Sequence, residues 1–292
     1  MLKALKKYRA PYLFIMPFFI LFLVFQLVPT IWTFYISLTN WKGIGTPDFC
    51  GFDNYRKMLI DDMFWESLGN TVVYWLTGLV FIICCALLIA SLLNSRYLKS
   101  NSVRAFFKTA TFLPNICAAI AMGLIFRMLF DENVGLVNEV VTMFGGSKIP
   151  WLTSTTFSKI PVIILNVWRY TPWFTMILLS GLLNISKDYY EAATVDGANG
   201  WQQFWFITLP SLKNILFFCS VTLTVDMWKL FNESYILPGP GTSNSSLFQY
   251  MYESGFNVFN MGYASAIGVI LILILIVISI IQFVVRHKQG EI

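Results

Sequence analysis

Six long apolar stretches constrain the fold of this chain more than any other feature of its sequence. They lie near residues 11–38, 71–93, 107–130, 158–183, 212–235 and 262–285. Each is long enough for a helix that crosses a bilayer, which needs about 20 mostly apolar residues. A spanning segment must satisfy its backbone hydrogen bonds internally, and a helix does so. We therefore expect an all-α transmembrane protein with six membrane-spanning helices, forming one transmembrane domain over residues 1–292.

The composition supports a membrane protein. Of the 292 residues, 57% are hydrophobic and only 12% are charged, whereas a soluble domain carries about 25% charged residues. The stretch 11–38 follows a basic start, as in a signal peptide, but it is too long for the apolar region of one, and no small-residue cleavage site follows. We expect this stretch to be retained as the first span.

Lysine and arginine residues are unevenly distributed between the connections. The N-terminal tail and the connection 94–108 carry four each, and the connection 184–213 and the C-terminal tail carry two each. The alternate connections carry three basic residues against five acids in 39–70, one basic residue in 131–157 and none in 233–261. Because cytoplasmic connections carry the excess of basic residues, both termini and the connection 184–213 are expected in the cytoplasm.

The connection 184–213 has the signals of a short, rigid helix. Ser186 can cap its start, and Glu191 falls early in the helix, where the dipole favours an anion. Gly197 offers a left-handed stop, so the helix is expected to end near Asp196. A second helical stretch is expected to begin near Gly200 and to lead into the next span.

This loop resembles the EAA loop of permease subunits of binding-protein-dependent ABC transporters. The resemblance is carried, at the family's spacing, by Glu191, Ala192, Ala193, Asp196, Gly197, Ile207, Leu209 and Pro210. Ser186 stands where the family often has proline, and a serine cap can do the same starting job. The resemblance implies that the loop 184–211 is a cytoplasmic coupling helix that docks on an ATPase subunit. The implied contact residues are Glu191, Ala192, Ala193, Asp196, Gly197 and Ala198.

Other parts of the chain resemble the sugar-type permeases of the same family. The resemblance is carried by the pairs Asn54–Tyr55 and Asn70–Thr71 and by Gly239, Pro240, Tyr252, Phe256, Gly262, Tyr263, Ala264, Ser265 and Ala266. Pro238 departs from the pattern, because that group often has glycine there. The resemblance implies a permease in the bacterial inner membrane that imports a sugar or an oligosaccharide. The implied partners are a second permease in a heterodimer, two ATP-binding subunits and an extracellular or lipid-anchored binding protein.

The sequence contains no motif for chemistry of its own. It has no P-loop, no HExxH and no GxSxG, so ATP would have to be hydrolysed by another polypeptide. Its five cysteines include no CxxC pair, and His287 is the single histidine, so no metal site is indicated. Basic runs with interleaved aromatic residues, which would suggest nucleic acid, do not occur. We expect no catalytic residue, no metal and no cofactor in this chain, which is therefore not an enzyme.

Three charged residues lie at depth within the predicted spans. They are Arg169, Asp226 and Lys229, and each costs about 2.5–3.5 kcal/mol on insertion scales unless it faces a cavity or a partner. One hypothesis is a buried pair between Arg169 and Asp226 that holds the fourth and fifth spans together. A second, overlapping hypothesis is a polar path that contacts the cargo. By its offset from Glu191 in the sugar permeases, that path would comprise Asn166, Arg169, Tyr170, Trp173, Asp226 and Lys229.

Two alternatives to an ATP-driven sugar importer remain open at this point. The cargo can be another polar solute, such as a glycerol phosphate. The chain can also be a self-contained transporter driven by an ion gradient, in which Arg169 and Asp226 relay a proton or an ion. The absence of an internal repeat argues mildly against that second alternative.

Overall fold

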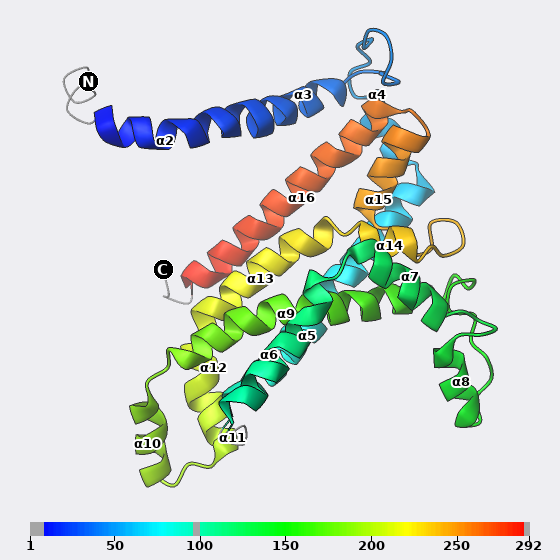
Figure 1. The fold of residues 1–292 in the computed structure, drawn as a ribbon. Coiled ribbons are helices and arrows are strands. Elements are labelled where there is room, and N and C mark those ends of the chain that lie inside the picture. The colour runs from blue at the N-terminus through cyan, green and yellow to red at the C-terminus, as the bar shows by residue number, and fades with distance from the viewer. Residues whose placement is uncertain (1–8, 96–99, 289–292) are drawn as a thin grey trace. The chain divides into compact units, whose positions relative to one another are not determined.

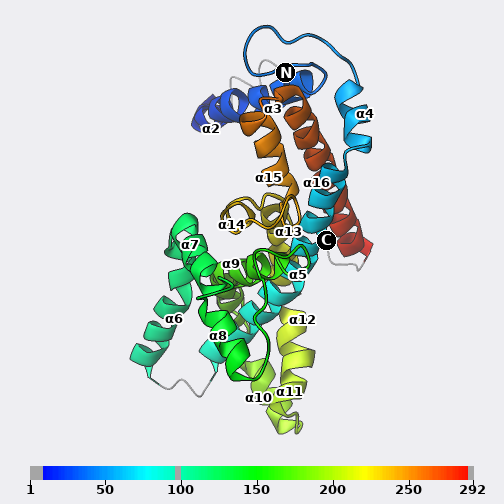
Figure 2. The same cartoon turned by 90° about the vertical axis from the view of Figure 1, so that its right-hand side faces the viewer.

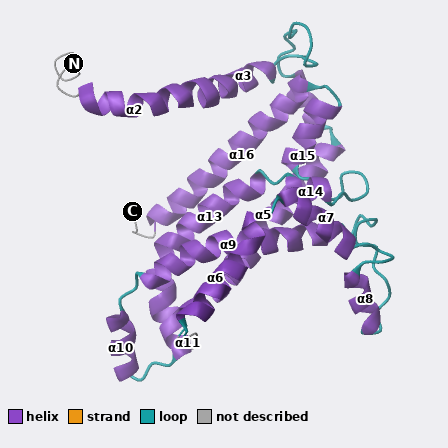
Figure 3. Cartoon of the chain, in the orientation of Figure 1, coloured by secondary structure: helices purple, strands orange, loops and turns teal. Residues whose placement is uncertain are grey.

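The computed structural model describes residues 9–95 and 100–288, and these residues are mostly helical (Figure 3). They contain no β-strand, and their extended backbone pairs only at an isolated bridge between Thr39 and Phe49. Five helices are long and apolar enough to cross a membrane, and a sharply bent pair brings the number to six if it counts as one span. The prediction of an all-α transmembrane chain is confirmed.

The five candidate spans other than the sharply bent pair match five of the six predicted stretches. The first runs through α2 (Arg9–Phe22), the π-helical turn η1 (Leu23–Leu27) and α3 (Val28–Ile36). The others are α5 (Asp62–Asn94), α9 (Lys159–Leu183), α13 (Lys213–Trp228) with α14 (Asn232–Ile236), and α16 (Met261–Lys288). The helix α5 begins well before the predicted stretch 71–93, because the polar residues at its start belong to the same helix.

The predicted third span, residues 107–130, is not one continuous helix. It is divided into α6 (Asn101–Ile116) and α7 (Ala119–Leu129), which are bent by 93°. Cys117 and Ala118 between them have extended backbone, with ψ of 142° and 129°. Pro114 lies in the last turn of α6 and donates no backbone hydrogen bond there. The predicted third span is therefore present as a bent pair, in which the first helix ends just after this proline.

The chain forms two compact units: residues 1–61 with 251–274, and residues 62–250 with 275–292. In the first unit, the Asn54 amide on α4 (Asp53–Leu59) donates to the carbonyls of Ser37 and Thr39, both at 2.9 Å. The Gly262 N–H donates to the Trp41 carbonyl at 3.0 Å, and a Cβ at Gly262 would lie 2.0 Å from the Thr39 oxygen. The Asn54 amide therefore holds two carbonyls in place, and a side chain at Gly262 would clash with the Thr39 carbonyl.

The core of the second unit is the packing of α5 along α9 and α13 (Figure 1). Ala86 and Ala90 on α5 are fully buried, and small residues of this kind let helices approach closely in a membrane. Larger buried side chains fill the remaining space between the three helices: Ile82, Leu165, Phe174, Leu178, Leu223 and Met227. The shorter α8 (Leu136–Met143), α15 (Leu247–Tyr252) and the π-helical turn η3 (Glu253–Asn257) complete the set of described helices, together with those of the 184–213 connection.

The loop of residues 237–246 ends in a polar run, Ser243 to Ser246, that is buried within the second unit. Asn70 on α5 donates to the carbonyls of Thr242 (2.8 Å) and Ser245 (2.9 Å). The Tyr74 hydroxyl donates to the Asn244 carbonyl at 2.7 Å. Irregular backbone is tolerated inside a membrane protein where other parts of the protein satisfy it, and α5 does so here.

The substitution Asn70→Ala should lower the free energy of unfolding by about 1–3 kcal/mol for each carbonyl that is left buried without a donor. The measurement is the thermal unfolding midpoint of the detergent-purified protein. Thr77→Val is the matched control, since the Thr77 hydroxyl bonds only to carbonyls of its own helix, at 2.7 and 3.3 Å. Equal midpoints for the Asn70→Ala variant and the wild type would show that the loop does not depend on this amide.

Candidate functional site

The first candidate site is the helix α10 (Lys187–Val195), which is closed at both ends. At its start, the Ser186 hydroxyl accepts the Asp188 N–H at 3.3 Å. At its end, Gly197 has a φ of +81°. The Ala198 N–H donates to the Ala193 carbonyl (2.8 Å), and the Gly197 N–H donates to the Thr194 carbonyl (3.1 Å). This pair of bonds with a left-handed glycine is the Schellman motif, so the predicted start and stop of the helix are both confirmed.

No residue of α10 is buried in this chain. Glu191, Ala192, Asp196 and Gly197 are exposed, and Ala193 and Ala198 are half-buried. Val195 is 88% exposed although it is apolar. A helix of nine residues with no buried face is marginal in water by itself, so other contacts must hold it.

Side-chain hydrogen bonds tie α10 to the next segment of the loop. The Tyr190 and Thr208 hydroxyls are 2.9 Å apart, and the Gln203 amide donates to the Thr194 hydroxyl at 2.9 Å. These partners lie in α11 (Gly200–Gln203) and in the π-helical turn η2 (Phe204–Thr208), which α12 (Leu209–Ser211) follows. Figures 1 and 2 both show α10 and α11 beyond the end of α9. These hydrogen bonds therefore brace the first arm of the loop, α10, against its second arm, which consists of α11 and η2.

The second arm begins with a capping box. The Asn199 side chain accepts the Gln202 N–H at 2.9 Å, and the Gln202 side chain accepts the Asn199 N–H at 2.8 Å. The expected second helical stretch from Gly200 is thus confirmed. The bracing residues Tyr190, Thr194, Gln203 and Thr208 were not identified from the sequence, because their pairing depends on how the chain folds back.

The second candidate site lies on α9, where Arg169 is paired with Glu233 on α14. The hypothesis of an Arg169–Asp226 pair was therefore wrong. The side chain of Glu233 is 2% exposed and that of Arg169 is 20% exposed. The Arg169 guanidinium also lies 5.6 Å from the centre of the Tyr170 ring. The pair is a charge-assisted contact that is largely removed from solvent.

A break in the predicted fifth span explains why Arg169 pairs with Glu233 and not with Asp226. Lys229 ends α13, and Phe231 has φ −135° and ψ −60°, which is not helical. In an unbroken helix, Glu233 would follow Lys229 by four residues and share its face. Because the helix breaks and restarts as α14, Glu233 meets Arg169 instead. The signal available in the sequence was Glu233 itself, a further acid near the end of the predicted stretch 212–235.

The structure gathers only some of the predicted path residues. Tyr170 lies beside Arg169 and Glu233, and Asp226 on α13 is also near it. Asp226 is half-buried and makes no ion pair with a described residue. Lys229 is exposed at the end of α13 and Trp173 is exposed on α9, so neither is enclosed with the rest in this chain alone.

Asn166 is the least satisfied polar residue of this group. It is 2% exposed, and neither its amide nitrogen nor its amide oxygen has a hydrogen-bond partner among the described residues. Buried polar groups are almost always paired, and an unpaired one calls for an explanation such as a ligand. Asn166 precedes Arg169 and Tyr170 by three and four residues, so the three share one face of α9.

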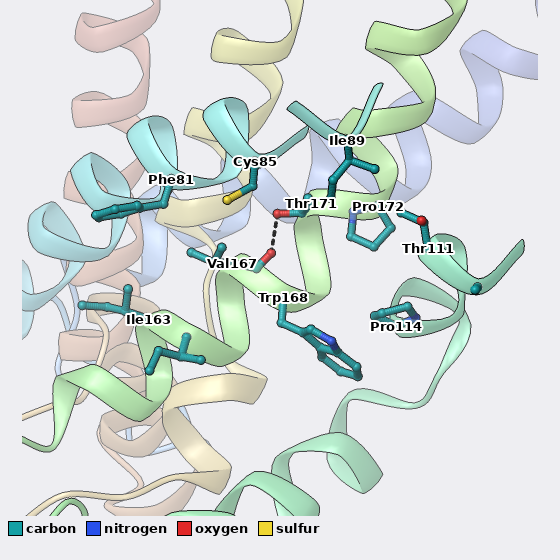
Figure 4. Close-up of a pocket in the computed structure, with 12 residues that line it drawn as sticks. Phe81, Cys85, Ile89, Thr111, Pro114, Ile163, Val167, Trp168, Thr171 and Pro172 are labelled. Carbon is teal, nitrogen blue, oxygen red and sulfur yellow. Dashed lines mark hydrogen bonds between the residues drawn. The ribbon is translucent and has the colours of Figure 1, made fainter. Parts of the chain in front are cut away.

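An apolar cavity of about 580 Å³ lies on another face of α9 (Figure 4). It is lined by Phe81, Cys85, Ile89, Ala110, Thr111, Pro114, Ile163, Ile164, Val167, Trp168, Thr171 and Pro172. The α9 members of this set follow helical spacing on the side opposite to Asn166 and Tyr170. This cavity is therefore separate from the polar cluster of Asn166, Arg169, Tyr170, Asp226 and Glu233.

The chain is similar to known transport proteins over nearly its whole length. Residues 82–290 match the family model described as "Binding-protein-dependent transport system inner membrane component". The arabinooligosaccharides transport system permease protein AraP of Bacillus subtilis (strain 168) is 35% identical over 290 residues, covering 98% of this chain and 91% of the relative. The lactose transport system permease protein LacF of Rhizobium radiobacter is 32% identical over 285 residues, covering 95% and 94%.

A solved structure has a similar fold. It is a bacterial alginate ABC transporter in complex with an alginate pentasaccharide-bound periplasmic protein. One of its chains superimposes with a TM-score of 0.87 at 22% identity, covering 100% of this chain and 98% of that one. At this identity the likeness concerns the fold alone.

Proposed function

This chain belongs to the family of inner membrane components of binding-protein-dependent transport systems, and from that premise we propose that it is the permease subunit of an ATP-driven importer of a sugar or an oligosaccharide. The observation that carries the proposal is the exposed, doubly capped and braced helix α10. A helix that is held rigidly but buries nothing within its own chain is suited to contact a partner and to transmit its movement.

The energy of ATP hydrolysis would reach this chain through the contact between α10 and a partner subunit. The sequence lacks a P-loop, so two separate ATP-binding subunits would hydrolyse ATP and move α10 as a unit. Glu191, which is exposed and makes no ion pair with a described residue, would face an arginine or a lysine of such a subunit. Closure of the two ATPases would then switch the transport path between its outward-open and inward-open states.

The cargo class follows from the relatives and from the polar cluster. AraP and LacF are named for arabinooligosaccharides and for lactose. In this chain Glu233 already compensates Arg169, and Asp226 adds a second carboxylate. An anionic cargo such as a glycerol phosphate would find no free arginine there, whereas neutral sugar hydroxyls can bind carboxylates and the Asn166 amide. Tyr170 adds an aromatic ring against which a sugar face can pack.

The complete transporter would contain a second permease, two ATPases and a binding protein that delivers the cargo. The first span, Tyr12–Ile36, has no buried residue in its most apolar window, so this window could contact lipid or a second permease. The exposed Trp173 and Lys229 would be enclosed when that subunit is present. Affinity purification of this chain from its native membrane should recover all three kinds of partner. Recovery of this chain without an ATPase subunit would contradict the proposal.

The orientation of the chain is testable by cysteine labelling. We expect Ser147→Cys to react with an impermeant maleimide in intact cells and Lys187→Cys to react only after the membrane is opened, because the basic connections lie in the cytoplasm. Both positions are exposed, and the five native cysteines would first be replaced by serine or alanine. Labelling of both positions from the same side would contradict the orientation.

A further inference from the structure

We propose that the apolar cavity between α5, α6 and α9 binds an anionic phospholipid, with an acyl chain in the cavity and the phosphate beside Lys108 on α6. The inference rests on the orientation argued under the proposed function, which places the start of α6 on the cytoplasmic side. It concerns a face of α9 that the polar cluster does not use.

The chemistry of the cavity suits hydrocarbon. Its lining is almost entirely carbon (Figure 4), and the Thr171 hydroxyl is already used in a hydrogen bond to the Val167 carbonyl at 2.5 Å. A volume of about 580 Å³ falls within the range of ~300–1,000 Å³ that is usual for small-molecule sites. A polar cargo would lose its hydrogen bonds with water in this cavity and gain few in return.

The bend after α6 explains why the cavity is present. Pro114 lines it, and the chain then turns through 93° into α7. Among the described residues, the lining comes from α5, α6 and α9, with no contribution from α7. The bend carries α7 away from the axis of α6, although the Phe126 ring on α7 still lies 5.6 Å from the Trp168 ring. Because α5 and α9 are apolar enough to cross a membrane, and α6 is so together with α7, lipid would border this cavity.

The charge near the cavity points to an anionic headgroup. Lys108 precedes the lining residue Thr111 by three residues, so both share a face of α6, about 4.5 Å apart along the axis. Arg104 lies one further turn toward the start of α6, where its guanidinium donates to the Ser95 carbonyl at 3.3 Å. The connection 94–108 contains no acid. Basic sites between membrane helices on the cytoplasmic side bind anionic lipid headgroups.

The test uses the assembled transporter in bilayers of phosphatidylcholine and phosphatidylglycerol, with bromine on the acyl chains of one lipid at a time. Bromine quenches tryptophan fluorescence on contact, and Trp168 lines the cavity. The difference between the wild type and Trp168→Phe isolates the signal of this residue. We expect brominated phosphatidylglycerol to quench Trp168 about fivefold more effectively than brominated phosphatidylcholine, the ratio expected from one basic residue near the membrane surface.

Two variants test separately the contribution of the headgroup contact and that of the cavity to the quenching. Lys108→Gln should bring the ratio close to one, while the matched control Lys159→Gln at the start of α9 should leave it unchanged. Ala110→Phe should fill the cavity and weaken quenching by both lipids. Equal quenching by the two lipids in the wild type would mean ordinary lipid contact, and no quenching would mean that a protein partner covers the cavity; either result overturns the proposal. Quenching needs no cargo, so a failure of the proposed transport function would show separately, in ATPase association and in Lys187→Cys labelling.

Discussion

In the assembled transporter, Gly197→Val should lower cargo-stimulated ATP hydrolysis by about 5- to 30-fold, the range that one or two kcal/mol produces in an equilibrium. Gly197 closes α10 with a φ of +81°, and nothing lies within 4 Å of a Cβ built there. The effect is therefore conformational and not a steric clash. A side chain in the left-handed region costs roughly 1–2 kcal/mol, and a β-branched one is especially unfavourable there.

Gly200→Val is the matched control for this prediction. Gly200 also has nothing within 4 Å of a built Cβ, and it is the first residue of α11 with no positive φ. The control should keep its stimulated hydrolysis, and in both variants the binding protein should still bind cargo. Equal losses in the two variants would mean that bulk in this loop matters, and not the left-handed stop of α10.

The second large effect is expected at the buried Arg169–Glu233 pair. Arg169→Gln or Glu233→Gln alone should destabilise the chain by about 3–5 kcal/mol, because each leaves an uncompensated charge in a buried setting. The double variant should recover most of that stability, since no charge remains. Thermal unfolding of the purified transporter and the yield of assembled complex measure this cycle.

Cargo uptake separates the two roles that the pair can have. If the pair lines the transport path, the stable double variant should still take up cargo poorly. Asp226→Asn is the companion variant, because Asp226 makes no ion pair with a described residue and its loss should impair uptake with little change in stability. Full uptake by the double variant would assign the Arg169–Glu233 pair to structure alone.

The sequence predicted most of the architecture because its signals are local. Apolar length located the spans, and serine and glycine located both ends of α10. The bend in the third span was not predicted, because apolar length does not distinguish a helix that tolerates Pro114 from one that ends after it. The break at Cys117 and Ala118 depends on tertiary packing, which a hydropathy pattern does not contain.

The polar cluster was less predictable for a related reason. A charged residue deep in a predicted span is expected to have a partner, and Arg169 does have one. Its partner was misassigned because Glu233, which follows the point where the backbone leaves the helix at Lys229–Phe231, was not counted among the charged residues at depth. The bracing of α10 by Thr208 and Gln203 likewise depends on contacts between two arms of a loop, and no pattern within either arm specifies them.

The central claim is that ATP hydrolysis on partner subunits drives this chain to import a sugar. The most direct measurement is uptake of a labelled neutral oligosaccharide into proteoliposomes that contain the complete transporter, with ATP inside and the loaded binding protein outside. We predict uptake only when both are present, and none from a proton or sodium gradient without ATP. Uptake that an ion gradient drives in the absence of ATP would contradict the account and favour a self-contained secondary transporter.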